Sequence, residues 1–163
     1  MAPQTLTLET RQAALSDASI MARLSMQLGY DSSEVVMRQR LTRLRDRPEH
    51  AVFVAALEGE PIVGWVHVEL RMPLWTEPFA EIIGLVADAS HRRIGTGRAL
   101  VERVVRWAED RQIGDLRARA QEHRDDALSF YESLGFELIK EHQVYRRMLV
   151  ETVETSGMPT LVD

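Results

Sequence analysis

The sequence predicts an α+β fold in a single domain, with a mixed, mostly antiparallel central sheet flanked by about four helices. Three observations support this. Strand-like and amphipathic helical segments follow one another in the order β-α-α-β-β-β-α-β-α-β-β. Two of the strands are separated only by the turn at residues 58–61, which predicts an antiparallel hairpin. The 163 residues, 45% of them hydrophobic, suit one domain with its own core.

The first half of the chain predicts a strand, two helices and the hairpin. Residues 5–11 alternate like a strand, two amphipathic helices follow over 16–28 and 33–47, and the hairpin strands are 51–57 and 62–70. The Ser-Asp pair that opens the first helix is suited to cap it. The second helix ends where a proline follows, because proline disfavours helix in the residue ahead of it.

The second half predicts a strand, a long helix, a short strand and another helix, over residues 79–87, 92–111, 115–120 and 124–134. The long helix carries apolar residues at helical spacing on one face. Two aspartates favour the start of the last helix, and a glycine closes it.

Two final strands are expected at residues 136–139 and 144–150, because both segments are apolar and β-prone. The domain then spans residues 1–150. Residues 151–163 have weak structural preferences and are expected to form a C-terminal tail.

The composition argues against several classes of protein. No stretch approaches the roughly 18 uninterrupted apolar residues of a membrane span, so no membrane association is expected. A formal net charge of −5 disfavours a nucleic-acid binder and suits a cationic substrate, although mild acidity that serves only solubility is an equal alternative. The absence of cysteine excludes a cysteine nucleophile, a thiolate metal site and disulfides. The first residues lack a secretory signal pattern, so a cytoplasmic location is expected.

A cluster of glycines and arginines lies where the strand at 79–87 gives way to the long helix. Free backbone N–H groups and the helix dipole meet at such a position and favour an anion. The glycines leave room for a diphosphate near the backbone, and the arginines add charge and directed hydrogen bonds. An ordinary strand-to-helix turn is the alternative. The cluster consists of Arg92, Arg93, Ile94, Gly95, Thr96, Gly97 and Arg98.

This loop does not fit two better-known phosphate motifs. The Walker run Gly-x-x-x-x-Gly-Lys-Ser/Thr does not occur, and the dinucleotide fingerprint would need a third glycine or alanine where Leu100 stands. A nucleoside triphosphate or a nicotinamide cofactor is therefore a weaker expectation than another diphosphate.

At this loop the chain resembles the GNAT superfamily of N-acetyltransferases, whose motif Gln/Arg-x-x-Gly-x-Gly/Ala is met at every fixed position by residues 92–97. Residues 127–136 match the family segment Ala-x-x-Phe-Tyr-x-x-x-Gly-Phe. Glu81 precedes Gly95 by the distance seen for the catalytic glutamate in histone-acetylating members. In element order the resemblance covers roughly residues 6–149.

The resemblance implies a GNAT-like fold and an N-acetyltransferase, with acetyl-CoA as cosubstrate and a primary amine of a small molecule or peptide as acceptor. It implies that the pyrophosphate binds main-chain amides of the loop. It also implies that the pantetheine arm lies along Leu85, Val86 and Ala87 like an added strand. Gly84 would mark the bulge that separates this strand from its neighbour.

An amine acceptor needs a base, because a lysine-like amine with a pKa of about 10.4 is almost fully protonated at pH 7. Glu81 is the candidate, because residues 81, 83, 85 and 87 share one face of a regular strand and can point toward the thioester. A solvent-facing glutamate without a catalytic role is the alternative.

Tyr131 matches the family residue that protonates the departing thiolate, although Phe130 and Tyr131 at helical spacing also suit a plain core. Backbone amides near residues 85–87 are candidates to polarise the thioester carbonyl. Without cysteine, direct attack in a ternary complex is expected rather than an acyl-enzyme.

The chain departs from the family pattern at two positions. Arg124 stands where many members have asparagine, and Ile83 where many small-molecule acetyltransferases have an acid. The histidines show no paired ligand spacing, so no metal is expected. Tyr30, Trp65 and Trp75 are candidates to line an acceptor cleft, with sheet packing an equal explanation for the tryptophans.

Two other functions stay open from the sequence. One is a non-catalytic coenzyme A-binding or regulatory module of the same fold, and the other is a nucleotide-binding protein. Many members of the family that the chain resembles are homodimers, so the final strand or the tail is a candidate dimer contact.

Overall fold

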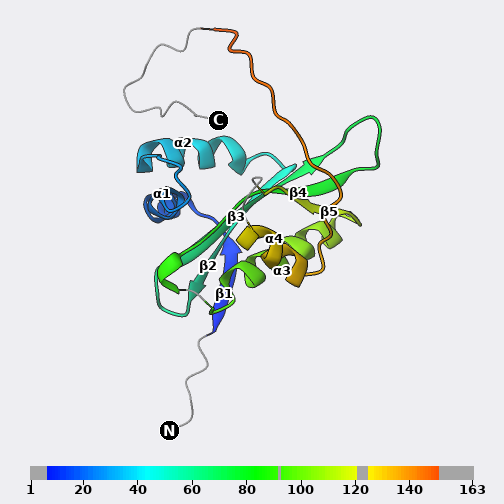
Figure 1. Ribbon diagram of the computed structural model, residues 1–163. Helices are drawn as coiled ribbons and strands as arrows, with labels where there is room; N and C mark the ends of the chain where they lie inside the picture. Colours follow the sequence, from blue (N-terminus) through cyan, green and yellow to red (C-terminus); the bar gives the residue numbers. More distant parts are fainter. Residues whose placement is uncertain (1–6, 92, 121–124, 151–163) are drawn as a thin grey trace.

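Figure 1 shows the computed structural model, which describes residues 7–91, 93–120 and 125–150. Five strands form one open sheet in the order β1-β2-β3-β4-β5. Antiparallel pairing joins the first four strands, and β5 is parallel to β4. The strands are β1 (Leu8–Gln12), β2 (His50–Leu57), β3 (Ile62–Arg71), β4 (Phe79–Ala87) and β5 (Leu116–Ala118). The predicted fold class and mixed, mostly antiparallel sheet are confirmed.

Four α-helices of the described chain flank this sheet on its two faces (Figure 1). α1 (Ala18–Met26) and α2 (Glu34–Arg45) cover one face, called here the α1/α2 face. α3 (Thr96–Asp110) and α4 (Asp125–Ser133) lie on the other, the α3 face. Each helix and each of these five strands lies where the sequence predicts it, with ends that shift by a few residues.

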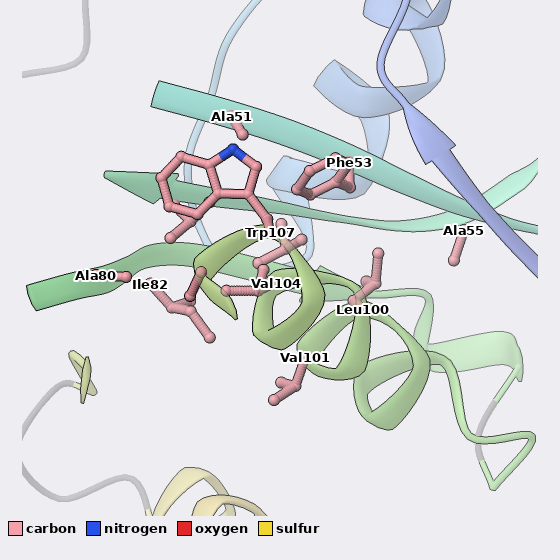
Figure 2. Close-up of a cluster of buried hydrophobic side chains, with 12 residues drawn as sticks. Ala51, Phe53, Ala55, Ala80, Ile82, Leu100, Val101, Val104 and Trp107 are labelled. Atoms are coloured by element: carbon pink, nitrogen blue, oxygen red, sulfur yellow. The ribbon is translucent and has the colours of Figure 1, made fainter. Parts of the chain in front are cut away.

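Two hydrophobic clusters, one on each face, hold the helices to the sheet. On the α3 face, alternate side chains of β2, β3 and β4 meet the apolar stripe of α3, as Figure 2 shows for Phe53, Ile82, Leu100, Val104 and Trp107. On the other face, the intervening side chains of the same strands pack against α1 and α2. The strands therefore read as nearly continuous apolar runs, since both of their faces are covered.

The two final strands predicted at residues 136–139 and 144–150 are not formed. Residues 137–150 carry neither helix nor strand, and none of the main-chain hydrogen bonds found in the described chain extends beyond Phe136. Their apolar side chains are largely exposed, with Val144, Tyr145 and Leu149 each more than 80% accessible. Alternation and β propensity favour an extended chain, but a strand forms only when a neighbour accepts its main-chain hydrogen bonds.

Three sequence predictions fall outside the described residues. They concern the tail at 151–163 and the positions of Arg92 and Arg124. Among the helices that the structure does describe, none combines the length and the apolar character that a membrane crossing needs.

The link between β1 and α1 is fixed by Asp17, which does not act as the expected cap. Its carboxylate accepts two hydrogen bonds from the Arg11 guanidinium, at 2.7 and 2.9 Å, and one from the Ala14 amide at 2.8 Å. No amide of α1 donates to this side chain. Asp17 is buried, and Arg11 holds the pKa of its carboxyl below the usual range. The residue therefore ties the strand to the turn ahead of the helix.

We expect Asp17→Asn to lower the free energy of unfolding by about 2 kcal/mol at pH 7, because hydrogen bonds to a charged partner contribute roughly 1.5–3 kcal/mol. The folded pKa of Asp17 is depressed, so the carboxylate's contribution is full above its unfolded pKa of about 4 and disappears as the pH falls through the lower folded value. Urea unfolding at pH 7 and pH 3 measures the effect. The difference between wild type and variant should shrink at pH 3.

The exposed Asp31→Asn is the control and should change stability by less than about 0.5 kcal/mol. A difference between wild type and Asp17→Asn that is equally large at both pH values would contradict a role for the Asp17 charge.

Candidate active site

β4 pairs with β3 along its whole length but with β5 over only three residues, Ala80–Ile82. The last main-chain hydrogen bond between β4 and the β5 segment runs from the Arg119 amide to the Ile82 carbonyl, at 3.2 Å. Beyond it, within the described chain, residues 83–87 have no main-chain partner on the β5 side. Leu85, Val86 and Ala87 lie on this open edge, where an extended ligand can bond to the backbone as a strand would.

A bulge in β4 corrects the expectation that residues 81, 83, 85 and 87 share one face. His67 pairs with Gly84 and Val68 with Ile82, which leaves Ile83 as an extra residue. One additional residue reverses the alternation of side chains beyond it. Leu85 therefore packs on the α3 face, whereas Glu81 and Val86 belong to the α1/α2 face. The predicted bulge lies beside Gly84, as the sequence suggested.

The loop between β4 and α3 leads from this edge to a helix N-terminus. Arg93 and Gly95 both have positive φ, 66° and 85°, and Gly95 is the N-cap residue of α3. The first intrahelical bond runs from the Ala99 amide to the Gly95 carbonyl. The preceding amides at the start of α3 are therefore free to bind an anion.

The side chains of the loop leave positive charge available. Arg93 and Arg98 are exposed and form no ion pair with any described residue. Thr96 is buried, and its hydroxyl has no hydrogen-bond partner among the described residues. The loop thus combines unpaired cations, free amides and a hydroxyl at one helix terminus, which is an arrangement suited to a diphosphate.

Gly97 has a packing role beside the ligand-binding role predicted for it. A Cβ at this position would lie 2.8 Å and 2.9 Å from two ring atoms of Phe130 in α4. The glycine therefore lets the Phe130 ring pack against the first turn of α3, a contact that sequence spacing does not predict. Gly95, in contrast, has open space around it and is needed for its left-handed backbone.

Tyr131 is held in an aromatic cluster next to Phe130. Its ring meets Phe130 and Phe136 edge to face, with centroids 5.0 and 5.2 Å apart. Burial raises the pKa of the Tyr131 phenol above its ordinary value, so the hydroxyl is protonated at neutral pH. The packing of Phe130 on Gly97 thereby couples the position of Tyr131 to the loop that precedes α3.

Glu81 is buried on β4, with 6% of its surface exposed. Its Oε1 lies 3.0 Å from Nε of Arg119, a residue just after β5, although the contact lacks the geometry of a hydrogen bond. Arg119 is the residue that the sequence analysis missed here. Its side chain is 58% exposed, so it is able to turn toward solvent and release the carboxylate.

A polar row across the sheet adjoins Glu81 on the α1/α2 face. Glu69 is the cross-strand partner of Glu81, and His50 is that of Glu69. His50 Nδ1 lies 3.0 Å from His67 Nε2, and Arg71 pairs with Glu69 at 3.3 Å. Burial, reinforced by His50, lowers the pKa of His67 to about 4, so this ring is neutral at pH 7. The alternation of His67 and Glu69 in β3 is the signal that could have placed them together.

The turn that begins the loop is tied to the end of α1 by Gln27. Its Nε2 donates to Asp88 at 3.1 Å, and its Oε1 accepts from the Ala89 amide at 2.9 Å. Asp88 also accepts from the amide and hydroxyl of Ser90. These hydrogen bonds lower the pKa of Asp88, and the bond from Gln27 has the largest effect. Asp88 is therefore a carboxylate at neutral pH. Gln27 and Asp88, which are 61 positions apart in the sequence, thus hold this turn in place.

The three aromatic residues suggested for an acceptor cleft have different surroundings. Trp65 packs in the cluster on the α1/α2 face, with Gly84 against its ring, so sheet packing accounts for it. Trp75 is 81% exposed between β3 and β4, and Tyr30 is 46% exposed after α1. Across the described chain, no group of three or more histidines and acids is placed to hold a metal ion.

Comparison with known proteins identifies the class to which this fold and site belong. The sequence pattern of the Acetyltransferase (GNAT) family matches residues 19–136. The chain therefore belongs to the GNAT acetyltransferase family. A comparison with curated protein sequences gives no significant match.

Solved structures share the fold at low identity. Aminoglycoside N-acetyltransferase AAC(6')-Iy in complex with CoA superimposes with a TM-score of 0.79, at 18% identity, over 90% of this chain and 99% of the other. A transcriptional regulator from Bacillus halodurans C-125 gives 0.76 at 22% identity, over 86% and 100%. An aminoglycoside acetyltransferase from an uncultured soil sample, in complex with sisomicin, gives 0.71 at 23% identity, over 86% and 97%.

We expect Gly95→Ala to weaken acetyl-CoA binding at least about tenfold, because an alanine cannot hold φ near 85° without roughly 1–2 kcal/mol of strain and the amides of the loop would shift. Isothermal titration calorimetry with acetyl-CoA measures this. Gly59→Ala is the matched control, since Gly59 has a φ of 75° and equally open surroundings in a remote turn.

The two variants should lose similar stability, and only Gly95→Ala should lose affinity. Equal affinity of both variants for acetyl-CoA would show that the loop does not grip the ligand.

Proposed function

We propose that this protein is an N-acetyltransferase that transfers the acetyl group of acetyl-CoA to a primary amine of a small molecule or peptide, by direct attack in a ternary complex. The observation that carries the proposal is the open edge of β4, followed after a short loop by a helix N-terminus whose Arg93 and Arg98 form no ion pair with a described residue. An edge of this kind suits the amide-rich pantetheine arm, and the helix N-terminus suits the diphosphate at its end.

In the proposed complex, acetyl-CoA lies along Leu85, Val86 and Ala87, with its diphosphate on the amides of the loop and near Arg92, Arg93 and Arg98. Main-chain N–H groups of β4 on the β5 side are free to polarise the thioester carbonyl. Family membership and the likeness to a structure that contains CoA support this assignment.

Transfer to an ammonium requires two protons to leave the acceptor nitrogen and one to reach the sulfur. Glu81, directly or through water, takes the proton from the ammonium once the acceptor displaces Arg119. The amine nitrogen then attacks the thioester carbon, a C–N bond forms and the C–S bond breaks. The Tyr131 hydroxyl donates its proton to the departing thiolate, for which its protonated state at neutral pH is suited. The resulting tyrosinate takes up, through water, the second proton that the acceptor nitrogen releases as the amide forms.

The acceptor is most consistent with a cationic small molecule. The net charge of −5 favours an amine-bearing ligand, and several proteins of the same fold are aminoglycoside acetyltransferases. The exposed Tyr30 and Trp75 offer aromatic surface for an ammonium group.

Incubating the protein with acetyl-CoA and a panel of aminoglycosides, polyamines, amino acids and peptides tests the proposal. Coenzyme A should be released only with a suitable amine, whose mass increases by one acetyl group. Glu81→Gln and Tyr131→Phe should each lower kcat about a hundredfold with little change in the KM for acetyl-CoA, as expected for the loss of a general base or acid.

Glu60→Gln and Tyr145→Phe, both at exposed positions, are the matched controls and should keep full activity. The pKa of Tyr131 is raised from its ordinary value of about 10, so the phenol should stay protonated below pH 10. Deprotonation of Tyr131 should therefore cause no loss of wild-type kcat below that pH. Binding of acetyl-CoA without any acetylated product would favour the non-catalytic module. A preference for ATP or a dinucleotide would favour a nucleotide-binding protein.

We further propose that residues 137–150 pair with a second copy of the chain to form a homodimer. The segment has a β-prone sequence, exposes Val144, Tyr145 and Leu149, and has no main-chain partner in the described chain. Exposed apolar segments of this length are commonly covered in an assembly.

Size-exclusion chromatography with light scattering should therefore give twice the chain mass. Replacing Val144 and Leu149 together by aspartate should give a monomer. Val35→Asp, at an exposed apolar site on α2, should leave the dimer intact. A wild-type monomer at all concentrations would contradict the dimer.

A further inference from the structure

A cavity of about 490 Å³ lies at the C-terminal half of α3, away from the loop at the start of that helix. Its walls come from the end of β1, the end of α2 with the turn that follows, and the start of β2. The remaining wall is formed by residues 103–111, at the end of α3. At 1.5 Å per residue, Gly97 and Arg106 are about 13 Å apart along the helix. The cavity is therefore separate from the proposed coenzyme A site, and its volume is typical of a small-molecule site.

The cavity is strongly basic in a chain with a net charge of −5. Its described lining contains two aspartates, Asp46 and Asp110, against five arginines. The arginines are Arg45, Arg47, Arg103, Arg106 and Arg111. All of them but Arg103 are exposed side chains, so an anion can reach them from solvent and reduce their mutual repulsion.

Most of these arginines have no hydrogen-bond acceptor or ion-pair partner among the described residues. The side chains of Arg45, Arg103 and Arg106 form neither hydrogen bonds nor ion pairs with any described residue, whereas Arg47 lies 3.8 Å from Glu49 and Arg111 donates to the Trp107 carbonyl at 3.1 Å. The Nε of Arg103 is buried and has no partner. A buried N–H group without an acceptor is costly, which favours a ligand that supplies one.

Two of the guanidinium groups lie over aromatic rings that line the cavity. Cζ of Arg103 lies 5.0 Å from the centroid of Phe53, and Cζ of Arg111 lies 4.2 Å from the ring of Trp107. Figure 2 shows Phe53 and Trp107 side by side between α3 and β2, beside Ala51. Guanidinium groups held by ring contacts keep N–H donors for oxygen atoms of phosphate or carboxylate.

We propose that this cavity is a second anion site, which binds a small molecule carrying two or more phosphate or carboxylate groups. Several arginines that share one hollow match several negative groups better than a single ion. An extended nucleic acid is disfavoured, because its binding needs a basic stripe rather than one basic hollow with two aspartates.

Calorimetric titration of the full-length protein with tripolyphosphate and with citrate tests the proposal. Saturating coenzyme A is present throughout, so that the loop at the start of α3 is occupied. We expect one site with micromolar to millimolar affinity that weakens as sodium chloride is added. Comparing the two probes shows whether phosphate or carboxylate is preferred, and either preference supports the site.

Matched variants locate the binding. Arg103→Gln combined with Arg106→Gln should weaken binding at least tenfold, whereas Arg23→Gln combined with Arg40→Gln, at exposed positions on α1 and α2, should not change it. Asp110→Asn removes a negative charge from the lining and should strengthen binding. This gain keeps the test independent of any loss of folding in the arginine variant.

Three results would overturn the proposal. They are no binding of either probe at millimolar concentration, binding that the Arg103 and Arg106 replacements leave unchanged, and binding of long polyanions such as heparin alone. A lower melting temperature of the arginine variant without any anion binding by wild type would assign these residues a structural role at the helix end. None of these outcomes depends on whether the protein acetylates an amine.

Discussion

The unequal pairing of β4 is the constraint on which the candidate site depends. One edge of this strand is bonded to β3 from end to end, while the other meets β5 over three residues and then has no further strand partner among the described residues. The extra residue at Ile83 falls where the two patterns change. Because the β3 side stays fixed, the open main-chain groups are held in place without a partner of their own. Glu81, the loop before α3 and Arg119 all adjoin this opening.

Contacts between α3 and α4 then position the remaining residues of the candidate site relative to this open edge. The Phe130 ring rests where the side chain of residue 97 would otherwise be, so α4 docks on the first turn of α3 and brings Tyr131 with it. The same glycine-rich turn thus serves main-chain geometry at Gly95 and helix packing at Gly97. Sequence reasoning treats this motif as one ligand-binding unit, but its two glycines meet different requirements. Gly95 allows a left-handed backbone, and Gly97 allows close helix packing.

Sequence patterns predicted the elements well where one strand or helix face is buried, because alternation and helical spacing report burial directly. They failed at residues 136–150, where β propensity is present but the described chain offers no partner strand. The bulge at Ile83 reversed the expected face of Leu85, and nothing local identifies which residue of a strand is the extra one. Arg119 and the basic cavity depend on residues distant in sequence, which periodicity cannot bring together.

The bond between Gln27 and Asp88 joins two segments that border the candidate site. Gln27 follows the last turn of α1, next to the stretch that leads to Tyr30, and its amide holds the turn ahead of the α3 loop from both sides. A molecule that presses on the end of α1 must also displace this turn. One uncharged side chain therefore connects the position of α1 to that of the loop before α3.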